Sequence, residues 1–418
     1  MEQIQQLLDK KTRIRHLKLS NQRIDIRVIQ ALAEALKINT ILTTLNIGSN
    51  QISHQGAQAL AKALKINTTL TILNLHRNQI GYQGAQALAE ALKINTTLIS
   101  LDLHYNQIGH QGAQFLAVLL EETNTTLTIL NLHSNQIGHQ GAQALAKTLK
   151  INIALTSLDL HYNQFGDQGA QFLAKTLETN TTLATLNLDH NQIGHQGAQT
   201  LAETLKINTM TKLYLSDNQI GHQGAQALAE ALKINATLTL IDLSNNQIGD
   251  QGVQSLSETL KINTTLTTLN LDLNQIGNQG AQALAEALKI NTTLITLRLV
   301  INQIGDQGAQ SLAEALKINT ILIKFNLGSN FIGEQGAQSL AEALKNNTNM
   351  TTLNLSYNQI RDNIILDTIE QKLKINTINK KRLRYLQILC LKKLKQLNRI
   401  DEIKSLNPTI YNSCLMKY

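Results

Sequence analysis

A unit of about 28 residues recurs along most of this chain and limits what it can fold into. The unit is close to N-T-T-L-T-T-L-N-L-x-x-N-Q-I-G-x-Q-G-A-Q-A-L-A-E-A-L-K-I. All spacings between equivalent residues are 28, apart from one of 29 before Asn135 and one of 27 before Asn218. A unit this short cannot bury its apolar side chains alone, so the repeat predicts stacked units that share one continuous core. The asparagine of the N-Q-I-G segment, here called the anchor, falls at Asn50, Asn78, Asn106, Asn135, Asn163, Asn191, Asn218, Asn246, Asn274, Asn302, Asn330 and Asn358.

Each unit contains a strand pattern followed by a helix pattern. Residues 73–75 alternate apolar and polar side chains, which predicts a short strand with one buried face. Apolar residues at i, i+3, i+4 and i+7 across residues 85–92 predict one face of a helix, and Gly81 permits the bend before it. The side chain of the anchor Asn78 can bond backbone groups, so we expect a column of asparagines along the strand ends.

The two layers of such a stack have different spacings. Neighbouring strands lie about 4.8 Å apart, whereas packed helices need about 8–10 Å. Equal numbers of strands and helices therefore curve the stack. We expect an α/β solenoid shaped like a horseshoe, with a concave parallel sheet and convex helices.

The repeat also resembles a known family. The string L-x-L-x-x-N-x-I followed by G-x-x-G-A-x-x-L-A-x-A-L is similar to the leucine-rich repeat of the ribonuclease-inhibitor type over roughly residues 17–373. Asparagine stands where ribonuclease inhibitor often has cysteine, so the nearer resemblance is to the repeats of NOD-like receptors. Their phosphate-binding string G-x-x-x-x-G-K-[ST] does not occur. The resemblance implies a horseshoe that binds proteins.

Pattern and charge divide the chain into three parts. Residues 1–16 are expected to form an N-terminal cap helix, residues 17–373 an array of about 13 units, and residues 374–418 a basic helical cap or tail. The tail holds eleven Lys and Arg against Asp401 and Glu402, and the rest of the chain holds 26 basic and 27 acidic residues. The net charge of +8 therefore belongs to the tail and is no evidence that the array binds nucleic acid.

The tail supports several interpretations. Its apolar stripe is flanked by basic residues, and we favour an amphipathic cap over the last repeat. A basic helix that binds an anionic membrane or nucleic acid is the alternative, as is a helix for a partner's groove. The stripe is formed by Leu383, Leu386, Cys390, Leu394 and Leu397.

The expected cellular compartment rests on targeting signals that the sequence does not show. Both cysteines, Cys390 and Cys414, lie in the tail, and no apolar signal stretch or transmembrane run is visible. We expect a cytoplasmic protein. The bias toward Ile, Lys and Asn and the near-identical repeats also suit a bacterial protein delivered into host cytosol. N-x-T sequons favour glycosylation in a secreted protein or, as we prefer, a turn role; they begin at Asn67, Asn95, Asn124, Asn180, Asn235, Asn263 and Asn291.

Polar side chains concentrate on the expected concave face in repeats three to seven. Residues four, two and one before each anchor point away from the core, and these are the positions that vary. Tyrosine is a good anchor for a protein partner, and Asp and His supply polar contacts. The candidate partner-binding residues are His76, Arg77, Asp102, His104, Tyr105, His133, Asp159, His161, Tyr162, Asp189 and His190.

Other interpretations of these columns remain open. The patch can be a solvated ladder copied by duplication, and histidines on adjacent strands can share a zinc ion. We expect no metal and no cofactor, because an open surface lacks the outer hydrogen bonds that orient metal ligands. Farther along, Leu273, Val300 and Ile301 form a small apolar patch. A second column of histidines precedes the expected helices, and we interpret it as part of the turns and helix caps. It contains His54, His110, His139, His195 and His222.

The favoured function is a non-catalytic, monomeric module that binds a protein partner on its concave face. No nucleophile, base and orienting residue stand together in the pattern, so we expect no enzyme. One alternative is a GTPase-activating regulator resembling the Ran type, for which Arg77 is the arginine at a strand-to-helix turn. Another is a rigid spacer that carries a basic tail for membrane or nucleic acid.

Overall fold

The computed structural model describes residues 14–120 and 125–396, and over these residues the strands form one 13-stranded sheet. The strands are β1 (His16–Lys18), β2 (Thr44–Asn46), β3 (Ile72–Asn74), β4 (Ser100–Asp102), β5 (Ile129–Asn131), β6 (Ser157–Asp159), β7 (Thr185–Asn187), β8 (Lys212–Tyr214), β9 (Leu240–Asp242), β10 (Thr268–Asn270), β11 (Thr296–Arg298), β12 (Lys324–Asn326) and β13 (Thr352–Asn354). The helices are α2 (Ile26–Ile38), α3 (His54–Leu64), α4 (Gly81–Leu92), α5 (Gly109–Leu120), α6 (Gly138–Leu149), α7 (Gly166–Leu177), α8 (His195–Leu205), α9 (Gly221–Leu232), α10 (Gly249–Leu260), α11 (Asn278–Leu288), α12 (Asp306–Ile318), α13 (Glu334–Asn346) and α14 (Asn363–Gln396).

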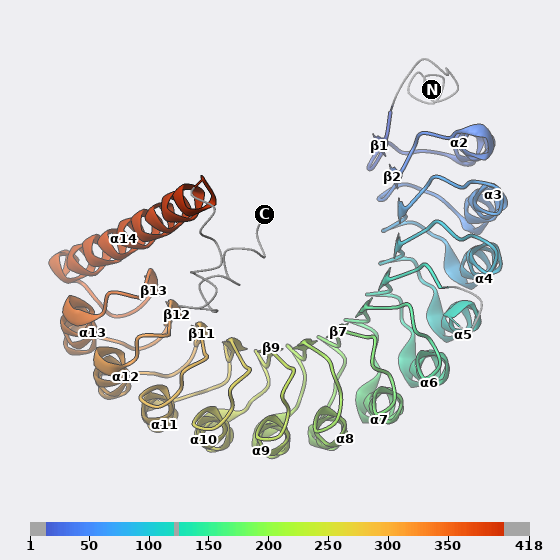
Figure 1. Ribbon diagram of the computed structural model, residues 1–418. Coiled ribbons are helices and arrows are strands. Elements are labelled where there is room, and N and C mark those ends of the chain that lie inside the picture. Colours follow the sequence, from blue (N-terminus) through green and yellow to red (C-terminus); the bar gives the residue numbers. More distant parts are fainter. Residues whose placement is uncertain (1–13, 121–124, 397–418) are drawn as a thin grey trace.

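The molecule is a horseshoe with the strands inside and the helices outside (Figure 1). Strands pair in chain order, all parallel. This confirms the predicted α/β solenoid with a concave sheet and convex helices. The curvature follows from the two layer spacings, because the helices of neighbouring units cannot approach as closely as their strands.

Neighbouring strands pair without any offset, so equivalent residues form straight columns. Leu73 lies opposite Leu101, and Asn74 lies opposite Asp102. The central residue of each strand from β2 to β12 is at most 1% exposed and packs into the shared core. Because side chains alternate along a strand, the residues on either side of it face the concave surface.

The anchor asparagines from Asn50 to Asn330 are buried, and each ties its unit to the one before it. The side-chain amide of Asn106 donates to the carbonyl oxygens of Leu75 and Leu103, both at 2.9 Å, and its Oδ1 accepts from the amide of Asn78 at 3.2 Å. Backbone groups buried away from water need such partners. Where the regular strand pairing ends, the asparagine column therefore supplies the hydrogen bonds that the backbone groups still need, as the sequence pattern predicts.

A second buried asparagine column explains the sequons. Asn95 donates to the carbonyl of Leu64 at the end of the preceding helix at 2.8 Å, and its Oδ1 accepts from the amide of Leu98 at 2.8 Å. The amide nitrogen that a glycan would modify is thus engaged in the core, which supports the turn role. Asn124 lies outside the described residues. The other sequon asparagines are equally buried: Asn67, Asn180, Asn235, Asn263 and Asn291.

The acidic residues that alternate with the second histidine column cap the helix of the following unit. Asp167 Oδ1 accepts from the amides of Gly194 and Gly197 at 2.7 and 2.8 Å, at the start of α8. Asp250 and Asp306 do the same for α11 and α13. Capping chemistry at these positions is confirmed, but it acts between units, which adds to their coupling.

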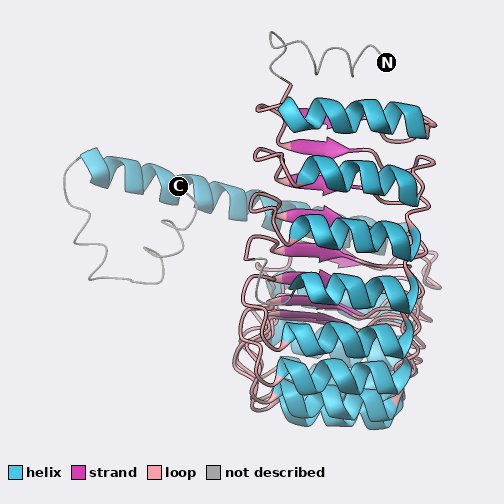
Figure 2. Cartoon of the chain, turned by 90° about the vertical axis from the view of Figure 1, so that its right-hand side faces the viewer, coloured by secondary structure: helices cyan, strands magenta, loops and turns pink. Residues whose placement is uncertain are grey.

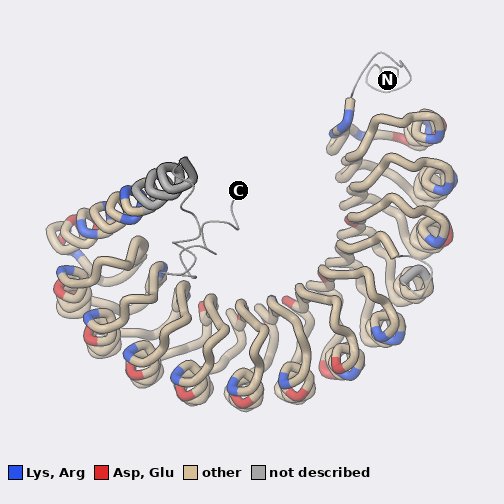
Figure 3. Tube along the Cα trace, in the orientation of Figure 1, with Lys and Arg blue, Asp and Glu red and all other residues tan. Residues whose placement is uncertain are grey.

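Most charge on the array lies on the convex side, where Lys and Arg alternate with Asp and Glu along the outer helices (Figure 3). Pairs three residues apart form short ion pairs, such as Lys206 with Glu203 at 2.6 Å and Lys261 with Glu258 at 2.7 Å. Exposed pairs of this kind contribute little stability. They keep the outer surface polar and the array close to neutral.

Helix α14 closes the core at its start and then leaves the array. The boundary expected between residues 373 and 374 falls inside this helix. Ile365, Ile369 and Leu373 are buried, and the side chain of Asn376 donates to the carbonyls of Asn347 and Met350 at 2.9 Å.

Beyond that contact α14 projects past the stack (Figure 2), and Ile378, Leu383 and Tyr385 are exposed. The expected N-terminal cap lies mostly outside the described residues, as does Leu397 of the tail stripe. No helix within the described ranges is both long and apolar enough to cross a membrane.

Candidate binding surface on the concave face

The residue just before each anchor, here called the presenting position, has an unusual backbone. Arg77, Tyr105, Tyr162 and His190 there have φ of 49°, 56°, 59° and 52°. Their amides still donate along the sheet direction, and that of Tyr105 reaches the carbonyl of His133 at 3.1 Å. The left-handed conformation turns the side chain out of the strand plane and toward the concave space.

Left-handed backbone is unfavourable for large side chains. Asn, Asp and Gly tolerate it best, whereas bulky and β-branched residues are strained. The array has Ser134, Asp217 or Asn245 at some presenting positions but also Tyr105 and Ile301. A strained residue persists where the surrounding structure holds it, and such residues cluster at functional sites. The exposed aromatic and aliphatic presenting residues therefore mark this column as a candidate contact surface.

Two residues before the anchors, four imidazole rings stack face to face. The rings of this histidine stack are separated by 4.6 Å between His76 and His104, 4.3 Å between His104 and His133, and 3.8 Å between His133 and His161. The rings are parallel within 8°, 14° and 13°. At the first end, His76 covers Gly48, where a Cβ atom would lie 2.1 Å from the ring. A side chain at residue 48 would therefore collide with the first ring of the stack.

Three of the four stacked rings are held by the last residue of the strand that precedes them. Asp102 Oδ1 lies 2.6 Å from Nδ1 of His104, and Asp159 Oδ1 lies 2.9 Å from Nδ1 of His161. Asn74 Oδ1 contacts Nδ1 of His76 at 2.5 Å. An open surface was not expected to provide such orienting bonds, and that prediction was wrong. The residue four before the anchor points the same way as the histidine and lies within its reach.

The stack favours uncharged imidazoles. Burial lowers the pKa of His133 to about 4, and the neighbouring His161 and His104 act in the same direction. Burial and then His104 also lower the pKa of His76. A cation beside other imidazoles in a partly dry setting is disfavoured on both counts. At neutral pH these two rings are therefore neutral and offer nitrogen atoms and ring edges instead of positive charge.

Tyrosines and an arginine frame the stack. The Arg77 guanidinium lies over the Tyr105 ring at 4.9 Å, and Tyr105 meets His133 edge-on at 5.1 Å. Tyr162 and His190 lie 5.5 Å apart. Tyr105 and Tyr162 remain exposed although each has a ring neighbour, so both present a rigid aromatic surface.

All eleven candidate residues lie on this face, but they form two groups. Residues from His76 to His161 belong to the stack and its frame, whereas Asp189 begins a second, acidic group. Asp189 Oδ1 accepts from the amide of Ser216 at 2.6 Å. Burial raises the pKa of Asp189 to about 7, Asp242 adds to the rise, and the Ser216 amide opposes it. This carboxyl group is therefore partly protonated at neutral pH.

One hydroxyl, imidazole and amide set does come together at the edge of the stack. Ser49 Oγ lies 3.1 Å from Nε2 of His76, whose Nδ1 contacts Asn74. A hydrolase would also need amides directed at a developing oxyanion. The amides of Ser49 and Gly48 already donate to His76 O and Asn46 Oδ1. The set lacks these free donors and is better explained as part of the hydrogen-bonded face.

Family models agree with the repeat along most of the chain. The model of the TMOD/LMOD leucine-rich domain matches residues 1–111. A model described as leucine rich repeat matches residues 123–146, 152–174, 179–202, 206–229, 235–257, 263–285, 291–313 and 346–366. The chain is a leucine-rich repeat protein. Domains of this family are generally non-catalytic and bind other proteins.

Solved structures with similar repeats are only distantly related. Leiomodin-1 actin-binding site 2 is 24% identical and covers 39% of this chain and 95% of its own, with a TM-score of 0.35. An internalin (inlF) from Listeria monocytogenes is 21% identical over 88% and 91%, and a TLR13–ssRNA13 complex is 20% identical over 77% and 41%; both have TM-scores of 0.46. These similarities indicate no function. No curated protein matches the chain.

Two acidic residues of the candidate surface of this leucine-rich repeat protein were not predicted from the sequence. Asp217 accepts from Ser216 Oγ at 2.7 Å and lies 3.1 Å from Nε2 of His190. Asp242 accepts from Ser244 Oγ at 2.6 Å and from Asn270 at 2.8 Å. Both acids occupy the varying columns one and four before an anchor, and that register was the available signal. They extend the candidate surface through β9 as an acidic region.

The apolar patch that the sequence predicts at Leu273, Val300 and Ile301 is present on the concave face but small. Leu273 and Ile301 are exposed at presenting positions of adjacent leucine-rich repeats, with φ of 55° and 51°. Arg298 beside them pairs with Asp272. Val300 is only half-buried, and its amide donates to Asp272 at 2.6 Å. The concave face therefore passes from imidazole and tyrosine, through acid, to aliphatic side chains.

Proposed function

We propose that the chain is a non-catalytic module that binds a protein partner on its concave face. The observation that carries this proposal is the presenting column, where Tyr105, Tyr162 and Ile301 are exposed in a left-handed backbone that disfavours them. Folding alone would favour Asn, Asp or Gly at these places. A contact made by the tyrosines explains why the strain is retained, and Tyr is among the residues that dominate binding energy at interfaces.

The surrounding chemistry supports a protein in place of a nucleic acid on this face. The central columns carry Asp102, Asp159, Asp189 and Asp242, which would repel phosphate groups. Neutral imidazoles add hydrogen-bonding capacity without positive charge. We further propose that the repeats are of the ribonuclease-inhibitor type, that the protein acts in a reducing cytosol as a monomer, and that any contact with membrane or nucleic acid involves the basic tail.

A capture experiment tests the concave-face proposal. The full chain and the double variant Tyr105→Ala/Tyr162→Ala are cross-linked in native cytosol, and the attached proteins are identified by mass spectrometry. We expect a partner captured by the wild-type chain to be lost at least about ten-fold in the variant, as for an aromatic hot spot.

A matched control separates this loss from a general effect of removing tyrosine. Tyr82→Ala removes an exposed tyrosine from α4 on the convex side, and it should leave capture unchanged. Equal capture by the double variant and the wild type would refute binding through this face.

A further inference from the structure

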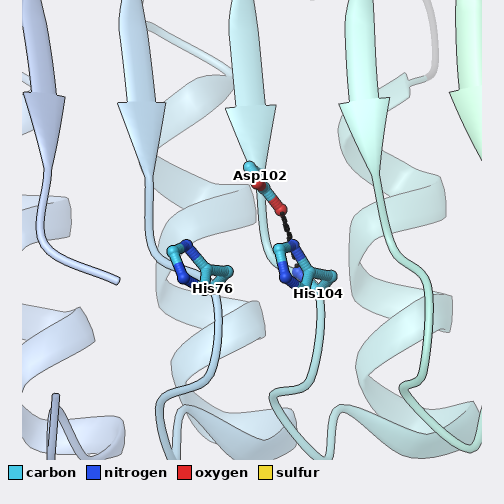
Figure 4. Close-up of side chains that lie close together, drawn as sticks. All are labelled: His76, Asp102 and His104. Carbon is cyan, nitrogen blue, oxygen red and sulfur yellow. Dashed lines mark hydrogen bonds and ion pairs between the residues drawn. The ribbon is translucent and has the colours of Figure 1, made fainter. Parts of the chain in front are cut away.

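Three metal-ligating side chains meet at the first gap of the histidine stack (Figure 4). His76 follows β3, and Asp102 and His104 lie at and just after the end of β4. One potential ligand atom from each lies within 4.8 Å of the others. Among the described residues this is the one group of three or more such side chains that meets that distance.

The cluster has the supporting bonds that metal sites require. Asn74 contacts Nδ1 of His76 at 2.5 Å and donates to Asp102 Oδ2 at 3.0 Å. Asp102 Oδ1 in turn lies 2.6 Å from Nδ1 of His104. In metal sites, such partners orient the imidazole and raise its basicity. Asp102 and His104 are already joined by a hydrogen bond, and a metal ion can take the place of the proton between them.

We propose that His76, Asp102 and His104 bind a transition-metal ion of the Zn²⁺ class, with water completing the coordination. Two imidazole nitrogens and one carboxylate are ligands that Zn²⁺ accepts with three protein groups and an open position. The site lies within the surface of the proposed function but does not depend on it.

The distances require a modest contraction. Ligand atoms around a tetrahedral Zn²⁺ lie about 3.4 Å apart, given bonds of about 2.0–2.2 Å. Atoms now up to 4.8 Å apart therefore approach by about 1.4 Å, which side-chain rotation supplies. All three side chains are half-buried, and the gap between His76 and His104 is the widest in the stack at 4.6 Å. The Arg77 guanidinium lies over the Tyr105 ring, so the positive charge of Arg77 is already paired with an aromatic ring.

Calorimetric titration of the metal-free full chain with ZnCl₂ tests the site. We expect one ion per chain, and a visible absorption band of four-coordinate cobalt when Co²⁺ is the probe. His104→Ala and Asp102→Asn should each weaken Zn²⁺ affinity by about 10-fold or more, since ligands matter at least as much as their supporting partners. Circular dichroism verifies that each variant is folded.

His161→Ala is the matched control, because His161 belongs to the same stack and is also held by an aspartate. It should leave the affinity and the stoichiometry unchanged. Absence of Zn²⁺ binding to the wild type, or equal binding by wild type, His104→Ala and Asp102→Asn, overturns the proposal. The metal titration contains no partner, so its outcome does not depend on the proposed function. Partner capture repeated with a chelator tests the proposed function separately from metal binding.

Discussion

At the scale of single residues, the concave face combines neutral and strained groups that an array built only for stability would avoid. Asp189 is the strongest case, because burial is the main cause that raises its pKa to about 7. Asp242 and Asp159 raise it further, whereas the Ser216 amide and His161 lower it. A carboxyl group whose pKa rises on folding binds more protons in the folded state. Its ionisation therefore reduces stability progressively as pH increases from about 4 to about 7.

Replacing this carboxyl group should remove the penalty. Asp189→Asn keeps an oxygen that can accept from the Ser216 amide but cannot ionise. We expect the stability advantage of the variant over the wild type to be about 1–2 kcal/mol larger at pH 8 than at pH 5, because the folded-state carboxyl group ionises between these values whereas the unfolded one is already ionised at both. Urea unfolding at both pH values measures this difference. A variant that is less stable at pH 8 would show that the charged form is favoured.

The columns of this face were predictable, but their internal contacts were not. Alternation along the strands and the 28-residue period identified His76, Tyr105 and the other exposed candidates. The left-handed backbone of Tyr105 and the bond between Asp102 and His104 depend on torsion angles that no residue type specifies. Asp217 was missed because the candidate surface was taken to end with repeat seven, whereas the same columns continue into the next unit.

At the scale of the elements, α14 differs from every other helix in the array. Its first part serves as the helix of the thirteenth unit, with Ile365, Ile369 and Leu373 against the core and Asn376 in the second asparagine column. After residue 376 it continues straight instead of turning into a strand (Figure 2). The apolar stripe predicted a helix, yet the loss of the glycine and turn residues did not reveal where contact with the array ends.

Two truncations separate the capping part of α14 from the projecting part. Deletion of residues 379–418 leaves in place every residue of the helix that the structure describes as buried, so we expect stability to change by less than about 1 kcal/mol. Deletion of residues 363–418 exposes Leu353 and Leu355 and should cost about 3 kcal/mol or more. Urea unfolding of both forms provides the measurement. A large loss in the shorter deletion would mean that the projecting part also covers the array.

At the scale of the whole molecule, stability arises from contacts between neighbours. Each strand pairs only with the next, and each anchor asparagine bonds only to adjacent units. Stability in such a stack is a sum of unit and interface contributions. The period alone allowed this architecture to be predicted, because equivalent residues must form columns when identical units stack.

Removal of one internal unit tests this additivity. Deletion of residues 236–263 joins Asn235 to Thr264 and restores the N-T-T-L string of the other units. We expect a folded protein with the same circular dichroism per residue and a slightly lower unfolding midpoint, because one unit and one interface are lost. A control deletion of half that length, residues 236–249, puts helix residues where a strand belongs and should prevent folding. An unfolded 28-residue deletion would show that distant units depend on one another.

The presenting position has a consequence for how such a protein can evolve. Its side chain is directed outward by the backbone of its own unit, so under the proposed function a replacement of Tyr105 or Ile301 would change recognition while the buried columns stay as they are. Duplication of a unit copies the stereochemistry of the contact together with the fold. Stability then depends on the buried columns and binding specificity on the presenting positions. New binding preferences can therefore arise by single substitutions that need no compensating change elsewhere.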